Sequence, residues 1–348
     1  MNFNYNKIRK KNYPYIIAEI GVNHGCSLKI AKKMILQAKK GGAHAVKFQT
    51  YKAEKIAKKD SRAYWDTSKE KTKSQFELFS KYDKFENNDY RQLATYCKNK
   101  KIDFLSTPFD IDAVDKLKNL VPVFKISSSD ITNYPLLYKI SKTKKPIILS
   151  SGASNLEEIK SAIKILKKGT NKIIIMHCIL NYPTKYNNAN LNMILSLKSE
   201  FPDYIIGYSD HTLPNADMTV LTTAYLLGAK VMEKHFTYNK KMKGNDHYHS
   251  MDTKDLLSLS KNLKKILIIL GKKRKKNFIK SELKSRKFAR RSIVITRDIK
   301  KNTIIKEKDL ITLRPNIGIP ANLWSKVIGK RTKKNLRANK TISWRDLK

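Results

Sequence analysis

The chain has 348 residues, of which 41% are hydrophobic and 9% aromatic, as in a globular protein with a sizeable core and unlike a disordered chain. It carries 73 Lys and Arg against 29 Asp and Glu, a formal net charge of +44. Such a charge suggests nucleic-acid or membrane binding, but the basic residues are spread along the chain without an arginine-rich arm, a zinc finger or an aromatic RNA-binding signature. We therefore expect a largely solvated charge, a few lysines that bind an anionic substrate, and no nucleic-acid partner.

Cysteine usage and the N-terminal region bear on the compartment. Cys26, Cys97 and Cys178 are odd in number and widely spaced, which favours neither a disulfide framework nor a cysteine zinc site. The first 21 residues lack the apolar core of a signal peptide, and no run approaches the length of a transmembrane helix. These features predict a cytoplasmic protein that does not bind membranes.

Short apolar runs alternate with longer amphipathic stretches over the first 270 residues. The candidate strands lie at 15–20, 43–50, 102–107, 122–130, 146–152, 172–178, 204–210 and 229–235. Helical periodicity marks the intervening stretches, among them 28–40, 155–168 and 216–228. This alternation predicts an α/β fold, a (β/α)₈ TIM barrel. A doubly wound open sheet is the alternative, but no G-x-G-x-x-G follows the first run.

The predicted strands begin apolar and end polar. In the run 229–235, alternation places Val231, Glu233 and His235 on one side of the strand. The run before it ends in Asp210 and His211. Barrel enzymes build their active sites at the carboxyl ends of the strands, and paired histidines there suit a metal or acid/base site. A single polar residue at a strand end has a simpler explanation as a helix cap, but eight such ends together do not.

The remaining segments predict the domain organisation. The longest insertion, 52–85, follows the second strand and is a candidate lid or rim. Residues 1–270 form the predicted barrel, and the basic, glycine-led stretch 271–287 the predicted linker. Brief segments broken by charged turns over 288–348 predict a compact second domain.

With these pieces placed, the chain resembles the sialic acid synthase family, which comprises N-acetylneuraminate synthase and its legionaminate and pseudaminate relatives. The tail resembles the antifreeze-like (SAF) domain that follows the barrel in this family, and the match spans the chain in order and spacing. The motifs are IIAEIGVNHG (16–25), AVKFQT (45–50), FLSTPF (104–109), FKISSSDITNYP (124–135), KKPIILSSG (144–152), MHCILNYPT (176–184), IIGYSDHT (205–212), EKHFT (233–237), GNDHYHSM (244–251), RRSIV (290–294), LRPNIGIP (313–320) and VIGK (327–330).

The resemblance implies a condensation of phosphoenolpyruvate with an N-acetylated mannosamine-type aldehyde. N-acetylmannosamine, giving N-acetylneuraminate and phosphate, is the first expectation. The alternative is a 2,4-diacetamido-trideoxy hexose, giving N,N'-diacetyllegionaminate or pseudaminate, and a remote one is a basic, non-catalytic binding protein. Two departures leave the sugar open. Gly25 stands where N-acetylneuraminate synthases commonly have a sugar-contacting glutamate, and Leu180 where the family has an asparagine.

Site residues follow from the same resemblance. Two lysines and several hydroxyl groups match positions that hold the phosphate and carboxylate of phosphoenolpyruvate, as a dianion and a carboxylate require. They are Lys47, Thr107, Lys125, Ser128, Ser150 and Ser209. Tyr182 also matches a substrate-binding position.

The resemblance further implies a metal and a partner subunit. His211 and His235 match the two metal ligands of the family; Mn²⁺ is expected there, with Mg²⁺ or Co²⁺ as alternatives. Glu233, Asp246 and a metal-bound water are the candidates for proton transfer. Arg314 matches an arginine that enters the sugar site of the other subunit in a domain-swapped homodimer.

Overall fold

A computed structural model describes residues 3–244, 246–272 and 275–348 of the chain. The chain divides into two compact units, residues 1–271 and 272–348, and each is described here by itself.

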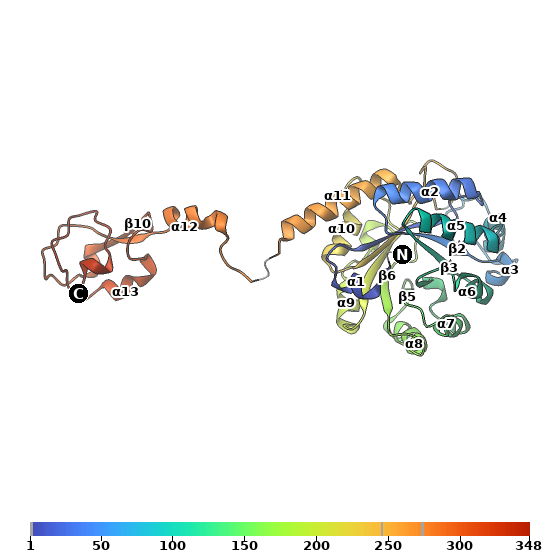
Figure 1. Cartoon of the computed structure of the whole chain (residues 1–348), viewed down its shortest axis with the longest axis horizontal. Coiled ribbons are helices and arrows are strands. Elements are labelled where there is room, and N and C mark those ends of the chain that lie inside the picture. The colour runs from blue at the N-terminus through green and yellow to red at the C-terminus, as the bar shows by residue number, and fades with distance from the viewer. Residues whose placement is uncertain (1–2, 245, 273–274) are drawn as a thin grey trace. The chain divides into compact units, whose positions relative to one another are not determined.

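The first unit is a parallel eight-stranded sheet rolled into a nearly closed barrel (Figure 1). Its strands are hydrogen-bonded in the order β3-β2-β1-β8-β7-β6-β5-β4, and β3 also contacts β4 at the seam. Their bounds are β1 Tyr15–Gly21, β2 Ala45–Thr50, β3 Asp103–Pro108, β4 Phe124–Ile126, β5 Ile147–Ser150, β6 Ile173–Cys178, β7 Ile205–Asp210 and β8 Val231–His235. The predicted TIM barrel is confirmed, and each predicted strand is present. β4 is the most shortened relative to its predicted range, because the chain turns into a 3₁₀ helix at Ser128–Asp130.

Helices pack around the barrel with local signals that explain their ends. Ser27 caps α2, since its hydroxyl accepts a hydrogen bond from Ile30 N, and Gly42, with a φ of +100°, ends it. The helices of this unit are α1 Tyr5–Lys10, α2 Leu28–Gly41, α3 Ala53–Ile56, α4 Gln75–Tyr82, α5 Asn87–Asn99, α6 Ile111–Leu117, α7 Tyr134–Ser141, α8 Leu156–Leu166, α9 Met193–Glu200, α10 Thr219–Leu226 and α11 Thr253–Leu270. No helix in the described ranges combines the length and apolar character needed to cross a bilayer.

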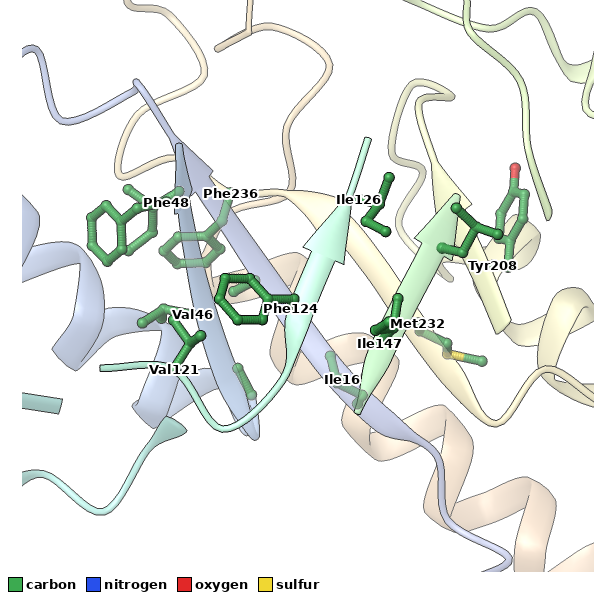
Figure 2. Packing of buried hydrophobic residues seen from close by; sticks show 14 of the residues in the cluster. Ile16, Val46, Phe48, Val121, Phe124, Ile126, Ile147, Tyr208, Met232 and Phe236 are labelled. Carbon is green, nitrogen blue, oxygen red and sulfur yellow. The ribbon is translucent and has the colours of Figure 1, made fainter. Parts of the chain in front are cut away.

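Alternate strand residues form two apolar layers. Outward-facing side chains pack between the strands and the helices, as Figure 2 shows for Ile16, Phe124 and Met232. Inward-facing side chains such as Ile17 fill the barrel interior, with Tyr5 of α1 packed against them. The inner layer therefore closes the amino-terminal end of the barrel and leaves the carboxyl end for polar residues.

The second unit is small and has a core of its own. Strands β9 (Ser292–Ile295) and β10 (Leu310–Leu313) pair antiparallel, and apolar side chains such as Ile293 and Ile342 pack beside them with the short helix α13 (Trp324–Val327). Part of the stretch predicted to be a linker is helical, with a 3₁₀ turn at Lys280–Glu282 and helix α12 at Leu283–Ala289.

Candidate active site

A cavity of about 530 Å³ lies at the carboxyl ends of the barrel strands. All the site residues predicted for the barrel line it. They are Lys47, Thr107, Lys125, Ser128, Ser150, Tyr182, Ser209, His211, Glu233, His235 and Asp246. The structure thus brings together side chains that are up to 199 residues apart in the sequence (Lys47 to Asp246).

Strand alternation explains why these side chains converge. An inward-facing apolar residue of the core is followed two positions later by an inward-facing polar one, as in Ile148 and Ser150 of β5 or Val231 and Glu233 of β8. The same step recurs in β1, β2, β3 and β4. A polar layer therefore lies directly on the apolar interior of the barrel.

Two buried lysines share this layer with two carboxylates. Lys47 Nζ contacts Glu19, donates a hydrogen bond to Thr107 Oγ1 at 2.8 Å, and lies 3.8 Å from Glu233 Oε1. Lys125 Nζ lies 3.1 Å from the same Glu233 oxygen. Glu19 lies near the end of β1, and the sequence indicated no role for it. The contact with Lys47 makes it part of the site.

Burial and neighbouring charges shift the titration of this network. Desolvation lowers the pKa of Lys47 to about 7, although Glu233 opposes the shift. Burial alone would raise the pKa of Glu233, but Lys125 and Lys47 outweigh it and hold that pKa below its ordinary value. The carboxylates therefore compensate the lysines, and an anionic ligand could take over that task.

The hydroxyl groups around the lysines differ in their partners. Ser128 Oγ accepts a hydrogen bond from Gly152 N at 2.9 Å, and Ser209 Oγ donates one to Glu233 at 3.3 Å. Ser150 Oγ is buried and has no hydrogen-bond partner within the described residues. A buried hydroxyl without a partner is uncommon in proteins, and an oxygen of a ligand in this cavity would supply one.

His211 and His235 lie side by side at the ends of neighbouring strands, with ring centroids 5.4 Å apart. Desolvation lowers the pKa of His211 to about 4 and that of His235 well below its usual value, so both rings are neutral at pH 7. His211 Nδ1 lies 2.8 Å from the carbonyl oxygen of Ile179. If Nδ1 donates to that oxygen, Nε2 carries a lone pair, which is the usual state of a metal-binding histidine.

The surroundings of His235 also fit a divalent ion. Its Nδ1 is buried, lacks a hydrogen-bond partner in the part of the chain that the structure describes, and lies 3.7 Å from Asp246 Oδ2. His249 adds a third ligand atom, and those of His235, Asp246 and His249 all lie within 4.8 Å of one another. His211 is not a member of this group. His249 belongs to the motif GNDHYHSM, in which a second histidine stands two positions before it, but the sequence indicated no role for it.

The insertion 52–85 forms part of the cavity wall, which confirms its prediction as a rim. Its lining residues are mostly aromatic or apolar: Lys55, Ile56, Tyr64, Trp65, Gln75, Leu78, Phe79 and Tyr82. Of the two departures noted in the sequence, Leu180 lines the cavity as well, whereas Gly25 does not. Gly25 has a φ of +54°, a conformation in which a residue with a Cβ is strained.

Arg314 belongs to the second unit, where it is exposed. Its expected role in the site of another subunit stays a prediction.

Comparisons with known proteins agree with this site. A NeuB family model matches residues 34–275, and a SAF domain model matches residues 290–348. The chain is 40% identical over 333 residues to N,N'-diacetyllegionaminic acid synthase of Campylobacter jejuni, with 94% of this chain and 98% of the relative covered. It is 37% identical over 338 residues to the Legionella pneumophila protein of the same name, with 95% and 93% covered.

A solved structure extends the likeness. N-acetylneuraminic acid (sialic acid) synthetase from Leptospira borgpetersenii aligns with a TM-score of 0.69 at 32% identity, over 78% of this chain and 90% of that chain. Three observations lead to the same family: the two domain matches, the identity to these relatives over nearly the whole chain, and the cavity that gathers the expected side chains. The chain belongs to the NeuB family and carries a SAF domain over residues 290–348.

Proposed function

We propose that this enzyme condenses phosphoenolpyruvate with a 2,4-diacetamido-trideoxy hexose to give N,N'-diacetyllegionaminate and phosphate. The observation that carries the condensation is the buried pair Lys47 and Lys125 in one cavity with the unpartnered hydroxyl of Ser150 and with neutral histidines. Two cations and several hydroxyl donors match a phosphate dianion and a carboxylate. This arrangement suits an enol-phosphate substrate.

The choice of sugar rests on the relatives and on the cavity wall. Two relatives at 40% and 37% identity are named N,N'-diacetyllegionaminic acid synthases. Leu180 and the aromatic side chains of the insertion, such as Trp65 and Phe79, give the cavity an apolar flank. Relative to N-acetylmannosamine, this sugar has one hydroxyl replaced by hydrogen and another by an acetamido group, so it presents more apolar surface to such a flank. N-acetylmannosamine, the first expectation from the sequence, is the second candidate, since the solved relative is a sialic acid synthetase.

The residues of the site have distinct tasks in this reaction. Lys47 and Lys125 hold the anionic groups, with Ser150 donating to one of their oxygens. C3 of the enol-phosphate attacks the aldehyde carbon of the open-chain sugar, and water adds at C2. Phosphate then leaves with cleavage of its bond to C2. Glu233 lines the cavity where it can move the protons of the water and of the new hydroxyl.

A divalent ion completes the site. His235 and Asp246 would hold it, with His211 beside them. When bound, such an ion supplies Lewis acidity toward the aldehyde oxygen. Imidazole nitrogens suit Mn²⁺ or Co²⁺ better than Mg²⁺. Between these two ions we propose Mn²⁺, because the family resemblance implies it.

We also propose a homodimer in which Arg314 serves the sugar site of the other subunit. Its support is the resemblance of LRPNIGIP to the corresponding family loop, and the exposure of Arg314 in its own unit.

Turnover by the purified full chain tests the proposal. Phosphate release from phosphoenolpyruvate is measured with Mn²⁺ and either the diacetamido sugar or N-acetylmannosamine, and the products are identified by mass. Faster turnover of the diacetamido sugar, measured as kcat/KM, is the expected result. Preference for N-acetylmannosamine would refute the sugar assignment, and phosphate release with neither sugar would refute the condensation.

A further inference from the structure

We propose that His249 is a ligand of the metal ion, together with His235 and Asp246. This inference deepens the proposed function, because it concerns the ion of the same site. It goes beyond the two histidines that the family resemblance implies, since it assigns to the ion an imidazole that is not one of that pair.

The backbone holds His249 close to His235. The segment that contains it runs alongside the end of β8, where Met251 N donates to the carbonyl oxygen of His235 at 2.8 Å and Thr237 N donates to Met251 O at 2.9 Å. Met251 and Phe236 pair as a parallel bridge. Because the two segments are joined on both sides of this bridge, the position of His249 is set by the sheet and not by a free loop.

A side chain from the first βα loop ties the same two segments together. Asn23 Nδ2 donates to the carbonyl oxygen of Phe236 at 3.1 Å and to Ser250 Oγ at 3.2 Å. Ser250 Oγ in turn hydrogen-bonds the carbonyl oxygen of Asp246. The three proposed ligands therefore belong to one hydrogen-bonded assembly, which positions them before an ion binds.

The spacing of the three ligand atoms suits one ion. Two nitrogen or oxygen atoms bonded to the same ion are at most about 4 to 5 Å apart, given bond lengths of about 2.0 to 2.5 Å. The ligand atoms of His235, Asp246 and His249 lie within 4.8 Å of one another, so small side-chain rotations suffice to close the site. His249 is fully buried, and its ring centroid lies 5.2 Å from that of His235.

The donor set also selects the class of ion. Two imidazoles and one carboxylate, with His211 as a neighbour, favour first-row transition ions such as Mn²⁺, Co²⁺ or Zn²⁺. Mg²⁺ prefers oxygen ligands and keeps several of its waters. The site should therefore bind Co²⁺ more tightly than Mn²⁺, and Mg²⁺ only weakly.

Ion binding by the full-length protein, measured after chelation, tests the inference without relying on turnover. Titration calorimetry with Mn²⁺ and with Co²⁺ compares the wild type, His249→Ala and a control, His44→Ala. His44 is a neutral imidazole at the amino-terminal end of the barrel, where its Nδ1 accepts a hydrogen bond from Ile16 N at 3.1 Å. We expect His249→Ala to raise the Kd by at least about tenfold, and His44→Ala to leave it unchanged. An equal Kd for the wild type and His249→Ala would overturn the assignment.

A second variant identifies the ligand directly. His249→Cys places a thiolate at the same position, and a thiolate bound to Co²⁺ gives a charge-transfer band in the near ultraviolet. The wild type is the reference, since Cys178 lies near His211 and could contribute a background. A new band supports the assignment even if His249→Ala fails to fold, and a folded Cys variant that binds Co²⁺ without the band contradicts it. Phosphate release by the wild type, measured in parallel, reports on the proposed function alone, so the two failures can be told apart.

Discussion

Lys234 Nζ lies 2.8 Å from Asp210 Oδ2, and both side chains are almost completely buried on the outer face of neighbouring strands β7 and β8. Lys234 also donates to the carbonyl oxygen of Thr212, while Thr212 N donates to Asp210 Oδ1 at 2.9 Å. The ion pair thus fixes the turn that carries His211. Because side chains alternate along a strand, those of the ion pair face away from the polar layer of the cavity. The pair therefore has a positioning role and does not contact a ligand in the cavity.

Replacing one member of this pair should destabilise the fold. In Lys234→Met a buried carboxylate loses its cation, which costs about 3 to 5 kcal/mol of unfolding free energy. The matched double variant, Lys234→Met with Asp210→Asn, removes both charges and should recover a large part of the loss. Urea unfolding followed by circular dichroism measures both. A single variant within about 0.5 kcal/mol of the wild type would mean that the pair does not hold the turn.

Lys125 should be needed for phosphoenolpyruvate. Lys125→Ala removes a buried cation 3.1 Å from Glu233 and leaves that carboxylate with only the more distant Lys47. We expect the KM for phosphoenolpyruvate to rise, or kcat/KM to fall, by about tenfold to a hundredfold, as for the loss of a charged hydrogen bond. Steady-state kinetics with the sugar saturating make the measurement, and Lys160→Ala, a surface lysine that is partly exposed, is the control. Unchanged kinetics in Lys125→Ala would reject the role.

Binding of phosphoenolpyruvate should weaken as the pH rises above 7. The pKa of Lys47 is lowered to about 7 by burial, so the free enzyme loses this charge above that pH. A bound dianion favours the charged form and raises the pKa in the complex, so binding then requires uptake of a proton. The KM should rise by up to about tenfold per pH unit above 7 until the pKa of the complex is reached.

The variant Lys47→Arg separates this effect from other titrations. A guanidinium stays charged over the whole range, so its KM should be nearly independent of pH between about 7 and 9, even if its absolute value is higher. A pH profile that is the same in the wild type and in Lys47→Arg would show that another group titrates.

Subunit exchange tests the proposed role of Arg314. Chains with Arg314→Ala and chains with His235→Ala should each be inactive alone. Mixed under conditions that exchange subunits, they should regain activity, because each heterodimer would contain one site with both residues intact. Wild-type protein taken through the same exchange is the control. If the wild type survives and the mixture stays inactive, Arg314 does not act across subunits.

The strands and much of the cavity lining could be predicted because side chains along a strand alternate between its two faces, with a period of two residues. Hydrophobic side chains of each strand must face one of two layers, and the residue two positions later shares that face, as in Val231 and Glu233. Family motifs then supplied roles for these positions. The shortened β4 was not predictable in this way, since the 3₁₀ turn at Ser128–Asp130 depends on local contacts within a polar segment.

The features that the sequence did not reveal depend on contacts between distant segments, which leave no periodic pattern in the sequence. His249 lies near His235 because Met251 pairs with Phe236 across a loop. Glu19 is one of several polar residues near the ends of the strands. Its contact with Lys47 becomes visible only when the pairing of β1 with β2 is known. Part of the rim has helical spacing, in Gln75, Leu78, Phe79 and Tyr82 of α4, whereas Tyr64 and Trp65 come from an irregular stretch that has no period.

The closed amino-terminal end of the barrel has a consequence for the order of events. Tyr5 and Ile8 of α1 pack against the apolar interior, so substrates, water and phosphate all pass through the same mouth. Lys47 and Lys125 lie beside Glu233, which is two residues nearer this floor than His235 on the inward face of β8. A sugar seated at the histidines would therefore stand in the way of an arriving anion. We therefore expect phosphoenolpyruvate to bind before the sugar, and the released phosphate to be among the last species to leave.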